Sequence, residues 1–164
     1  MTALALTIGS IVATAVLYQT QSVERDRIRD TIDTQLALSQ TLSALQDAET
    51  GQRGYLLTGR ERYLEPFTRA SAELKGTLDN LGSRLSDEQQ SALRELRNAS
   101  DQKLAELNET IALKRAGRDA EVLAAVLSDR GKNLMDQARV IVGRMQDTEG
   151  ASLRRPRTWL PAFF

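Results

Sequence analysis

The feature that most constrains the fold of this sequence is a repeat of apolar residues at alternating steps of three and four. Four stretches of the chain carry this repeat, with a few polar residues inserted. The spacing places the repeated residues on one face of a helix, and it is typical of helices packed in a left-handed bundle. The stretches are Leu38, Leu42, Leu45, Glu49, Gln52 and Leu56, preceded by Ile28 and Ile32; Leu64, Phe67, Ser71, Leu74, Leu78, Leu81 and Leu85; Leu93, Leu96, Ser100, Leu104, Leu107 and Ile111; and Leu123, Val126, Arg130, Leu134, Ala138, Ile141 and Met145. The repeat predicts an all-α fold.

Local signals divide this part of the chain into four predicted helices, at residues 20–57, 60–85, 87–116 and 118–149. The tetrapeptides that begin at Thr58 and at Ser86 have the form of a capping box, which starts a helix. Gly117 is placed to end the third helix, because glycine adopts the left-handed conformation after a helix at little cost. Links of a few residues make successive helices antiparallel, so residues 19–149 are predicted to form an up-down-up-down four-helix bundle.

Charge and composition exclude several classes of function. The 22 lysines and arginines balance the 22 aspartates and glutamates and are interleaved with them, so no broad basic face is available for nucleic acid. The chain has no cysteine and no histidine, which removes thiolate metal sites, the usual zinc sites, serine–histidine catalysis and a phospho-accepting histidine. Lys132 follows Gly131 without the other residues of a phosphate-binding loop. We expect no catalytic residue, no metal, no cofactor and no enzymatic activity.

An uncharged run at residues 2–18 predicts a transmembrane helix over residues 1–18. At 1.5 Å per residue the run spans about 25 Å, slightly less than the ~30 Å hydrocarbon core of a bilayer. A cleaved signal peptide is one alternative, since residues 13–15 have the A-x-A form, and a buried core helix is another. The membrane anchor is preferred because the run lacks a basic N-terminal region and its apolar part precedes the A-x-A too closely.

The orientation of this predicted anchor is in conflict with the rest of the interpretation. Arg25, Arg27 and Arg29 follow the run and no basic residue precedes it, so the positive-inside rule places the following domain in the cytoplasm. These arginines are interleaved with acidic residues, but the rule counts arginines and not net charge. A start codon assigned too far downstream would explain the missing basic residues.

Residues 45–67 place polar side chains and glycines where a plain bundle would have leucines. Glu49 and Gln52 fall on the first seam, and Arg53 lies four residues after Glu49, spaced for an ion pair. Gly51 and Gly54 each cost about 1 kcal/mol relative to alanine within a helix, which indicates close backbone approach or a local bend. A satisfied polar layer that fixes the helix register is the favoured interpretation of the polar residues. A direct part in ligand binding or signal switching is the alternative.

Residues 47–59, continuing through residues 63–67, resemble the third class of CHASE domains, sensory domains associated with cyclases and histidine kinases. A second, looser match covers residues 131–136 with Arg139, Ile141, Met145 and Glu149, and the resemblance extends over about residues 20–149. The candidate signature or signalling residues are Glu49, Gln52, Arg53, Gly54, Tyr55, Gly59, Tyr63 and Pro66.

The resemblance implies a four-helix bundle on the outer side of the bacterial cytoplasmic membrane, held between two membrane helices. Domains of this family are usually dimers, and they act on histidine kinases, diguanylate cyclases or chemoreceptor signalling domains. The family implies no single ligand. We therefore expect an extracytoplasmic sensory domain on the periplasmic or extracellular side, a homodimer, and an output kinase or cyclase domain that this chain lacks.

The last residues depart from the family pattern. Residues 150–164 contain Pro156 and Pro161 and are too short and too interrupted to form the second membrane helix, so we predict an irregular tail. A truncated gene, or one read out of frame, is the preferred explanation, and an amphipathic surface anchor is the alternative. A membrane-anchored helical scaffold or adaptor that oligomerises without sensing is the alternative function, because the heptad pattern alone does not exclude it.

Overall fold

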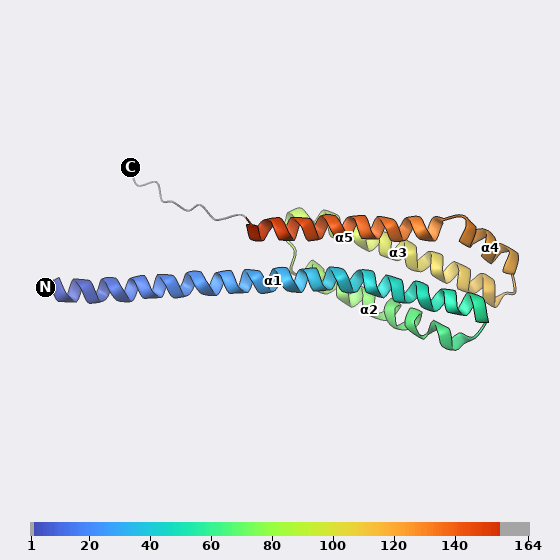
Figure 1. Cartoon of the computed structure of the whole chain (residues 1–164), viewed down its shortest axis with the longest axis horizontal. Coiled ribbons are helices and arrows are strands. Elements are labelled where there is room, and N and C mark those ends of the chain that lie inside the picture. The colour runs from blue at the N-terminus through green and yellow to red at the C-terminus, as the bar shows by residue number, and fades with distance from the viewer. Residues whose placement is uncertain (1, 155–164) are drawn as a thin grey trace. The chain divides into compact units, whose positions relative to one another are not determined.

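A computed structural model describes residues 2–154 of the chain, and every regular element in this range is helical (Figure 1). The elements are α1 (Thr2–Thr58), the 3₁₀ helix η1 (Glu61–Leu64), α2 (Glu65–Gly82), α3 (Asp87–Arg115), α4 (Asp119–Leu127) and α5 (Arg130–Arg154). The predicted all-α class is confirmed for these residues.

Two compact units divide the chain, Met1–Asp33 and Thr34–Phe164. In the first unit the described residues belong to α1. Ile28 and Ile32, predicted on the first buried seam, are 42% and 56% exposed, so the seam prediction is wrong there. Within residues 2–154 no helix contains a stretch both long and apolar enough to cross a membrane. The predicted membrane helix at residues 1–18 is not confirmed.

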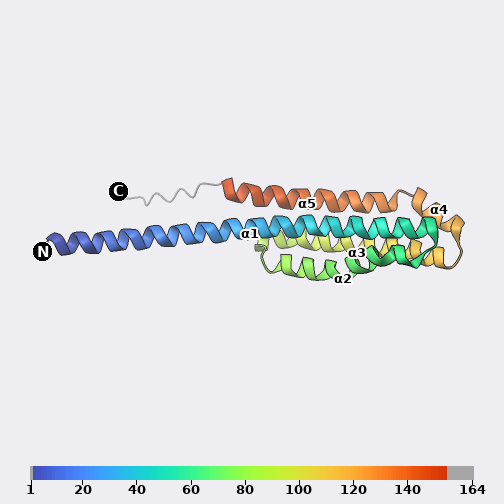
Figure 2. The same cartoon turned by 60° about the horizontal axis from the view of Figure 1, so that its bottom comes forward.

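The second unit has one main apolar core, to which α1 from Thr34 onward, α2, α3 and α5 all contribute. Both views show these helical segments side by side, and Figure 1 shows that each runs opposite to the one before it (Figures 1 and 2). The core residues include Leu38 and Leu45 of α1, Leu74, Leu78 and Leu81 of α2, Leu93 and Leu96 of α3, and Met135, Ile141 and Met145 of α5. The apolar stripes of four helical segments therefore shield each other from water, which is the main source of stability in such a unit.

The start of the second predicted helix differs from the prediction. Residues 60–85 were expected to be one helix capped by Thr58, whereas the chain forms η1 first and α2 begins at Glu65 and ends at Gly82. Pro66 explains the start, because proline lacks the backbone N–H and fits only the first turn of an α-helix. Thr58 is the last residue of α1, which Gly59 terminates with a φ of 66° and an N–H donated to the Tyr55 carbonyl at 2.8 Å.

Two other predicted signals are confirmed. Ser86 caps the N-terminus of α3 in a capping box, with its backbone N–H donating to Oε1 of Gln89 at 3.4 Å. Gly117 follows the end of α3 with a φ of 71°. The Arg118 N–H then donates to the Leu113 carbonyl at 3.0 Å, which satisfies a carbonyl at the end of that helix.

The fourth predicted helix, residues 118–149, is not continuous. It is broken into α4 and α5 around Asp129, which has a φ of 56°. The break resets the helical phase, so Leu123 and Val126 of the predicted seam are exposed and Val122 is buried instead. The helix also extends to Arg154, into the predicted irregular tail, and the rest of that tail, from residue 155, lies outside the described residues.

Ser100 offers a test of the core packing. The residue is fully buried on the α3 seam, and its hydroxyl has no hydrogen-bond partner within the described part of the chain. Removing an unsatisfied buried hydroxyl relieves its desolvation cost, so Ser100→Ala should raise the free energy of unfolding by about 1 kcal/mol. Thermal unfolding followed by circular dichroism measures the change. Ser71→Ala is the control, since the Ser71 hydroxyl donates to the Phe67 carbonyl at 2.8 Å, and an equal gain in both variants would contradict the assignment.

Candidate functional site

The two glycines of the signature lie where α1 meets η1 and the start of α2. A Cβ atom on Gly51 would lie 2.9 Å from the carbonyl oxygen of Tyr63 and 3.1 Å from the backbone nitrogen of Phe67. A Cβ atom on Gly54 would lie 2.9 Å from Cδ1 of Tyr63. Gly51 therefore needs glycine because the backbone of η1 and α2 approaches it closely, and Gly54 because the Tyr63 side chain does.

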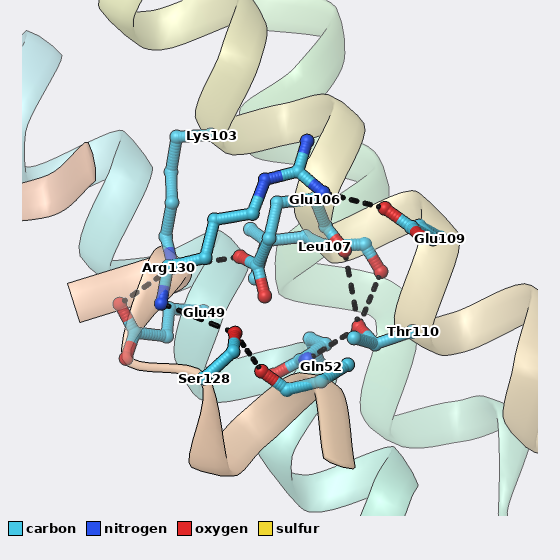
Figure 3. A network of polar contacts seen from close by, with 10 residues as sticks. Glu49, Gln52, Lys103, Glu106, Leu107, Glu109, Thr110, Ser128 and Arg130 are labelled. Carbon is cyan, nitrogen blue, oxygen red and sulfur yellow. Dashed lines mark hydrogen bonds and ion pairs between the residues drawn. The ribbon is translucent and has the colours of Figure 1, made fainter. Parts of the chain in front are cut away.

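A buried ion-pair network joins α1 to helix α3 (Figure 3). The ammonium of Lys103 donates a hydrogen bond to Oε2 of Glu106 at 3.0 Å and lies 3.4 Å from Oε2 of Glu49. The side chain of Lys103 is 2% exposed, that of Glu106 9% and that of Glu49 31%. One buried cation is thus shared between a carboxylate of its own helix and a carboxylate of α1.

A hydrogen bond between neutral groups continues this polar layer toward the end of α1. The amide nitrogen of Gln52 donates to the hydroxyl of Thr110 at 2.6 Å, and both residues are buried. The Thr110 hydroxyl in turn lies 2.9 Å from the Leu107 carbonyl, to which it donates. Gln52 therefore keeps its amide satisfied in the core only when α1 and α3 are in this register.

The layer also reaches the first turn of α5. A Cβ atom on Gly131 would lie 2.8 Å from Oε2 and 3.0 Å from Cδ of Glu106, so the absent side chain leaves room for that carboxyl group. A carboxylate at the N-terminal turn of a helix also interacts favourably with the helix dipole. Gly131 begins the second block of the predicted resemblance, and Glu49 belongs to the first. Lys103 and Glu106 therefore connect the two blocks.

An ion pair and a hydrogen bond hold the chain at the start of α5. Arg130 donates to Oε2 of Glu109 at 3.0 Å, and its backbone N–H donates to the Ser128 hydroxyl at 3.3 Å (Figure 3). These contacts satisfy groups at the break between α4 and α5. They place Gly131 beside Glu106.

The remaining candidate residues have structural positions outside the polar layer. Arg53 is exposed, and Glu49 pairs with Lys103 instead of with Arg53, so the predicted ion pair is wrong.

Tyr55 is buried in a small cluster with Leu64 and Ile111. Gly59 ends α1, and Pro66 occupies the first turn of α2.

Tyr63 and its neighbour Glu61 tie η1 to other parts of the unit. Tyr63 packs its ring on Gly54 and remains 38% exposed. Glu61 accepts two hydrogen bonds from Arg115 of α3, at 2.8 and 2.7 Å, and these lower the pKa of the Glu61 carboxyl. Because the pKa is depressed in the folded state, the stabilisation is present above the ordinary pKa of glutamate and is lost as pH falls through the lowered value.

Lys103, Glu106 and Thr110 were not among the candidate residues of the sequence analysis. Together with Ala99 they recur at steps of four, three and four, a second stripe beside the α3 seam, and all four are buried. That stripe is the sequence pattern that could have identified these residues. Among the described residues no three acidic, histidine or cysteine side chains are grouped closely enough to hold a metal ion. The arrangement holds one buried cation between carboxylates of two helices.

Gly131→Ala should destabilise the second unit. The added methyl group displaces the Glu106 carboxyl group from Lys103, and overpacking of this kind costs about 1–3 kcal/mol. Gly143→Ala is the matched control on the same helix, because nothing lies within 4 Å of its Cβ position. It should gain up to about 1 kcal/mol in helix propensity. Urea denaturation compares the two, and equal gains would contradict the packing of Gly131 on Glu106.

Lys103→Met should lower the free energy of unfolding by about 3–5 kcal/mol, because it leaves the Glu106 carboxylate buried without its cation. The double variant Lys103→Met with Glu106→Gln should recover part of this loss, since the remaining buried group is then neutral. Urea denaturation of the two variants and the wild type measures both effects. A Lys103→Met variant as stable as the wild type would show that the network contributes nothing.

Comparisons with known proteins identify the family. Residues 24–157 match the CHASE3 domain family, a range that contains Glu49, Lys103, Glu106 and Gly131. Among solved structures, the sensor domain of the Rhodopseudomonas palustris histidine kinase HK9 is similar at a TM-score of 0.67 and 32% sequence identity, over 73% of this chain and 95% of that chain. A search of curated proteins found no match. The predicted resemblance is confirmed, and the chain belongs to the CHASE3 domain family of sensory domains.

Proposed function

We propose that this chain is the extracytoplasmic sensory module of a bacterial membrane receptor. Its output would be a histidine kinase, a diguanylate cyclase or a chemoreceptor signalling domain, and it would act as a homodimer. The observation that carries the proposal is the position of Lys103, whose ammonium lies 3.4 Å from Glu49 of α1 and 3.0 Å from Glu106, against the start of α5. A sensory domain must couple the movements of its helices, and this contact makes the position of α1 depend on the position of α3.

The proposed architecture is an up-down-up-down four-helix bundle that follows an N-terminal membrane helix. Within the second unit, the segment of α1 near Thr34 and the end of α5 lie at the same end (Figure 1). Gln146 of α5 donates to the Ser39 hydroxyl of α1 at 3.4 Å, near that end. These two helices would then connect the domain to the membrane. The membrane attachment rests on the family and on the uncharged run at residues 2–18.

The proposed mechanism is a shift of α1 against α3 and α5. The contact between Lys103 and Glu49 is the longer of the two and involves the more exposed carboxylate, whereas Lys103 and Glu106 lie on one helix and move together. A displacement of α1 therefore weakens the Glu49 contact first and removes the Gln52 hydrogen bond to Thr110. Because buried unpaired groups are costly, the helices would favour two discrete registers over intermediate positions.

The chain would supply detection only, and catalysis would belong to the output domain. No enzymatic activity is proposed, because the sequence contains no histidine or cysteine and no cluster of catalytic residues. A scaffold that only oligomerises is the competing function. The two differ in one respect, namely whether changing the polar layer alters an output.

A hybrid receptor provides that test, with residues 20–149 replacing the sensory domain of a well-characterised histidine kinase. Glu49→Gln removes one charge beside Lys103 and keeps the side-chain shape. It should change basal kinase output at least about twofold, as expected for a coupling change of about 0.5–2 kcal/mol. Asp101→Asn, at an exposed carboxylate of α3, is the control and should leave output unchanged. With equal membrane levels, identical outputs from Glu49→Gln and the wild type would favour the scaffold.

A further inference from the structure

A groove runs along the surface between α1 and α2, and the polar layer does not use it. Its volume is about 490 Å³, within the range of small-molecule sites. Ala44 and Ala70 form its small-residue lining, and they pack on the cluster that contains Ala48 and Leu107. The α1 side of the groove runs from Gln40 to Asp47, roughly 10 Å at 1.5 Å per residue. The groove is therefore long enough for a small extended molecule.

The charged groups along this groove lack strong partners. Asp47 of α1 and Glu73 of α2 line it, and neither forms an ion pair within the described part of the chain. Arg69 lies on the same wall as Glu73, and its ion pair, with Glu65, is long at 3.9 Å and solvent-exposed. By contrast, Asp79 further along α2 accepts from both Lys75 and Arg97 at 2.7 Å. Two carboxylates and one guanidinium are thus available to a ligand.

This set of charges selects a ligand with the opposite set, two cations and one anion. A dibasic α-amino acid has two ammonium groups separated by an aliphatic stem, and one carboxylate. We propose that the groove binds such a molecule, the class of lysine and ornithine, through Asp47, Glu73 and Arg69. The two carboxylates accept from the ammonium groups, the guanidinium binds the carboxylate bidentately, and the stem lies on Ala44 and Ala70.

The position of the groove connects binding to the proposed mechanism, and in this respect the inference rests on the proposed sensory function. Asp47 lies two residues before Glu49 on α1, so the ligand and Lys103 hold different faces of the same helical turn. A ligand that bridges Asp47 and Glu73 adds an attraction between α1 and α2. It would therefore favour the register of α1 in which both carboxylates reach it.

Isothermal titration calorimetry of the full 164-residue chain in mild detergent tests the site, with L-lysine as the probe. We expect saturable binding of L-lysine at millimolar concentrations or below. L-Norleucine lacks the side-chain ammonium and cadaverine lacks the carboxylate, so each should bind at least about tenfold more weakly, the loss expected for one charge-assisted contact. Absence of L-lysine binding, or equal binding of L-lysine and L-norleucine, would overturn the proposal.

Surface variants then locate the site. Asp47→Asn and Glu73→Gln should each weaken L-lysine binding at least about tenfold, whereas Asp101→Asn should bind as the wild type does. All three positions are exposed, so circular dichroism should show the wild-type fold in each. Wild-type affinity in both groove variants would place the ligand elsewhere and refute the assignment. A chain that fails to bind L-lysine while Glu49→Gln still alters hybrid-receptor output would refute the groove alone and leave the sensory function intact.

Discussion

The shared cation at Lys103 sets the register of the second unit. Its side chain is 2% exposed, and burying an ammonium at that depth is tolerable only with carboxylates in contact. Glu106 supplies one from the same helix, and Glu49 supplies the other from α1. Since apolar stripes slide past each other at modest cost, the charged contact specifies which turn of α1 faces which turn of α3. Gln52 and Thr110 repeat that specification with a neutral pair.

Glycine placement follows from the same register. Gly51 and Gly54 allow α1 to approach η1 and α2, and Gly131 leaves space for the Glu106 carboxyl group at the start of α5. Gly76 and Gly143 meet nothing at their Cβ positions. The former three are therefore needed for packing, whereas the latter two carry only the conformational cost of glycine in a helix. The difference lies in the neighbouring helix, not in the local sequence.

The sequence predicts the features that depend on local spacing, and it fails where a neighbouring helix or the backbone conformation determines the structure. Seam positions on α2 and α3, the cap at Ser86 and the stop at Gly117 follow from periodicity and backbone conformation. The break near Asp129 was missed because Val126, Arg130 and Leu134 keep the helical spacing across it. The apolar repeat gives no indication that Asp129 adopts a positive φ.

The candidate site shows the same division. Glu49 and Gln52 were identified because polar residues on an apolar seam are conspicuous, and both take part in the polar layer. Their partners were not identified, since a lysine and a glutamate three residues apart look the same on a solvated face and in a core. The wrong partner for Glu49, Arg53, has the correct spacing along one helix. The actual partner belongs to a helix about fifty residues later in the chain.

A buried charge shared between helices is well suited to signalling because its partners are few and discrete. If α1 moves, the ammonium of Lys103 can keep Glu106 and exchange Glu49 for water or another acceptor, but it cannot follow α1 continuously without losing contact with Glu106. In the proposed mechanism the polar layer would therefore cost some stability relative to a fully apolar core, and in return it would convert a small displacement of one helix into a change of ion-pair partner.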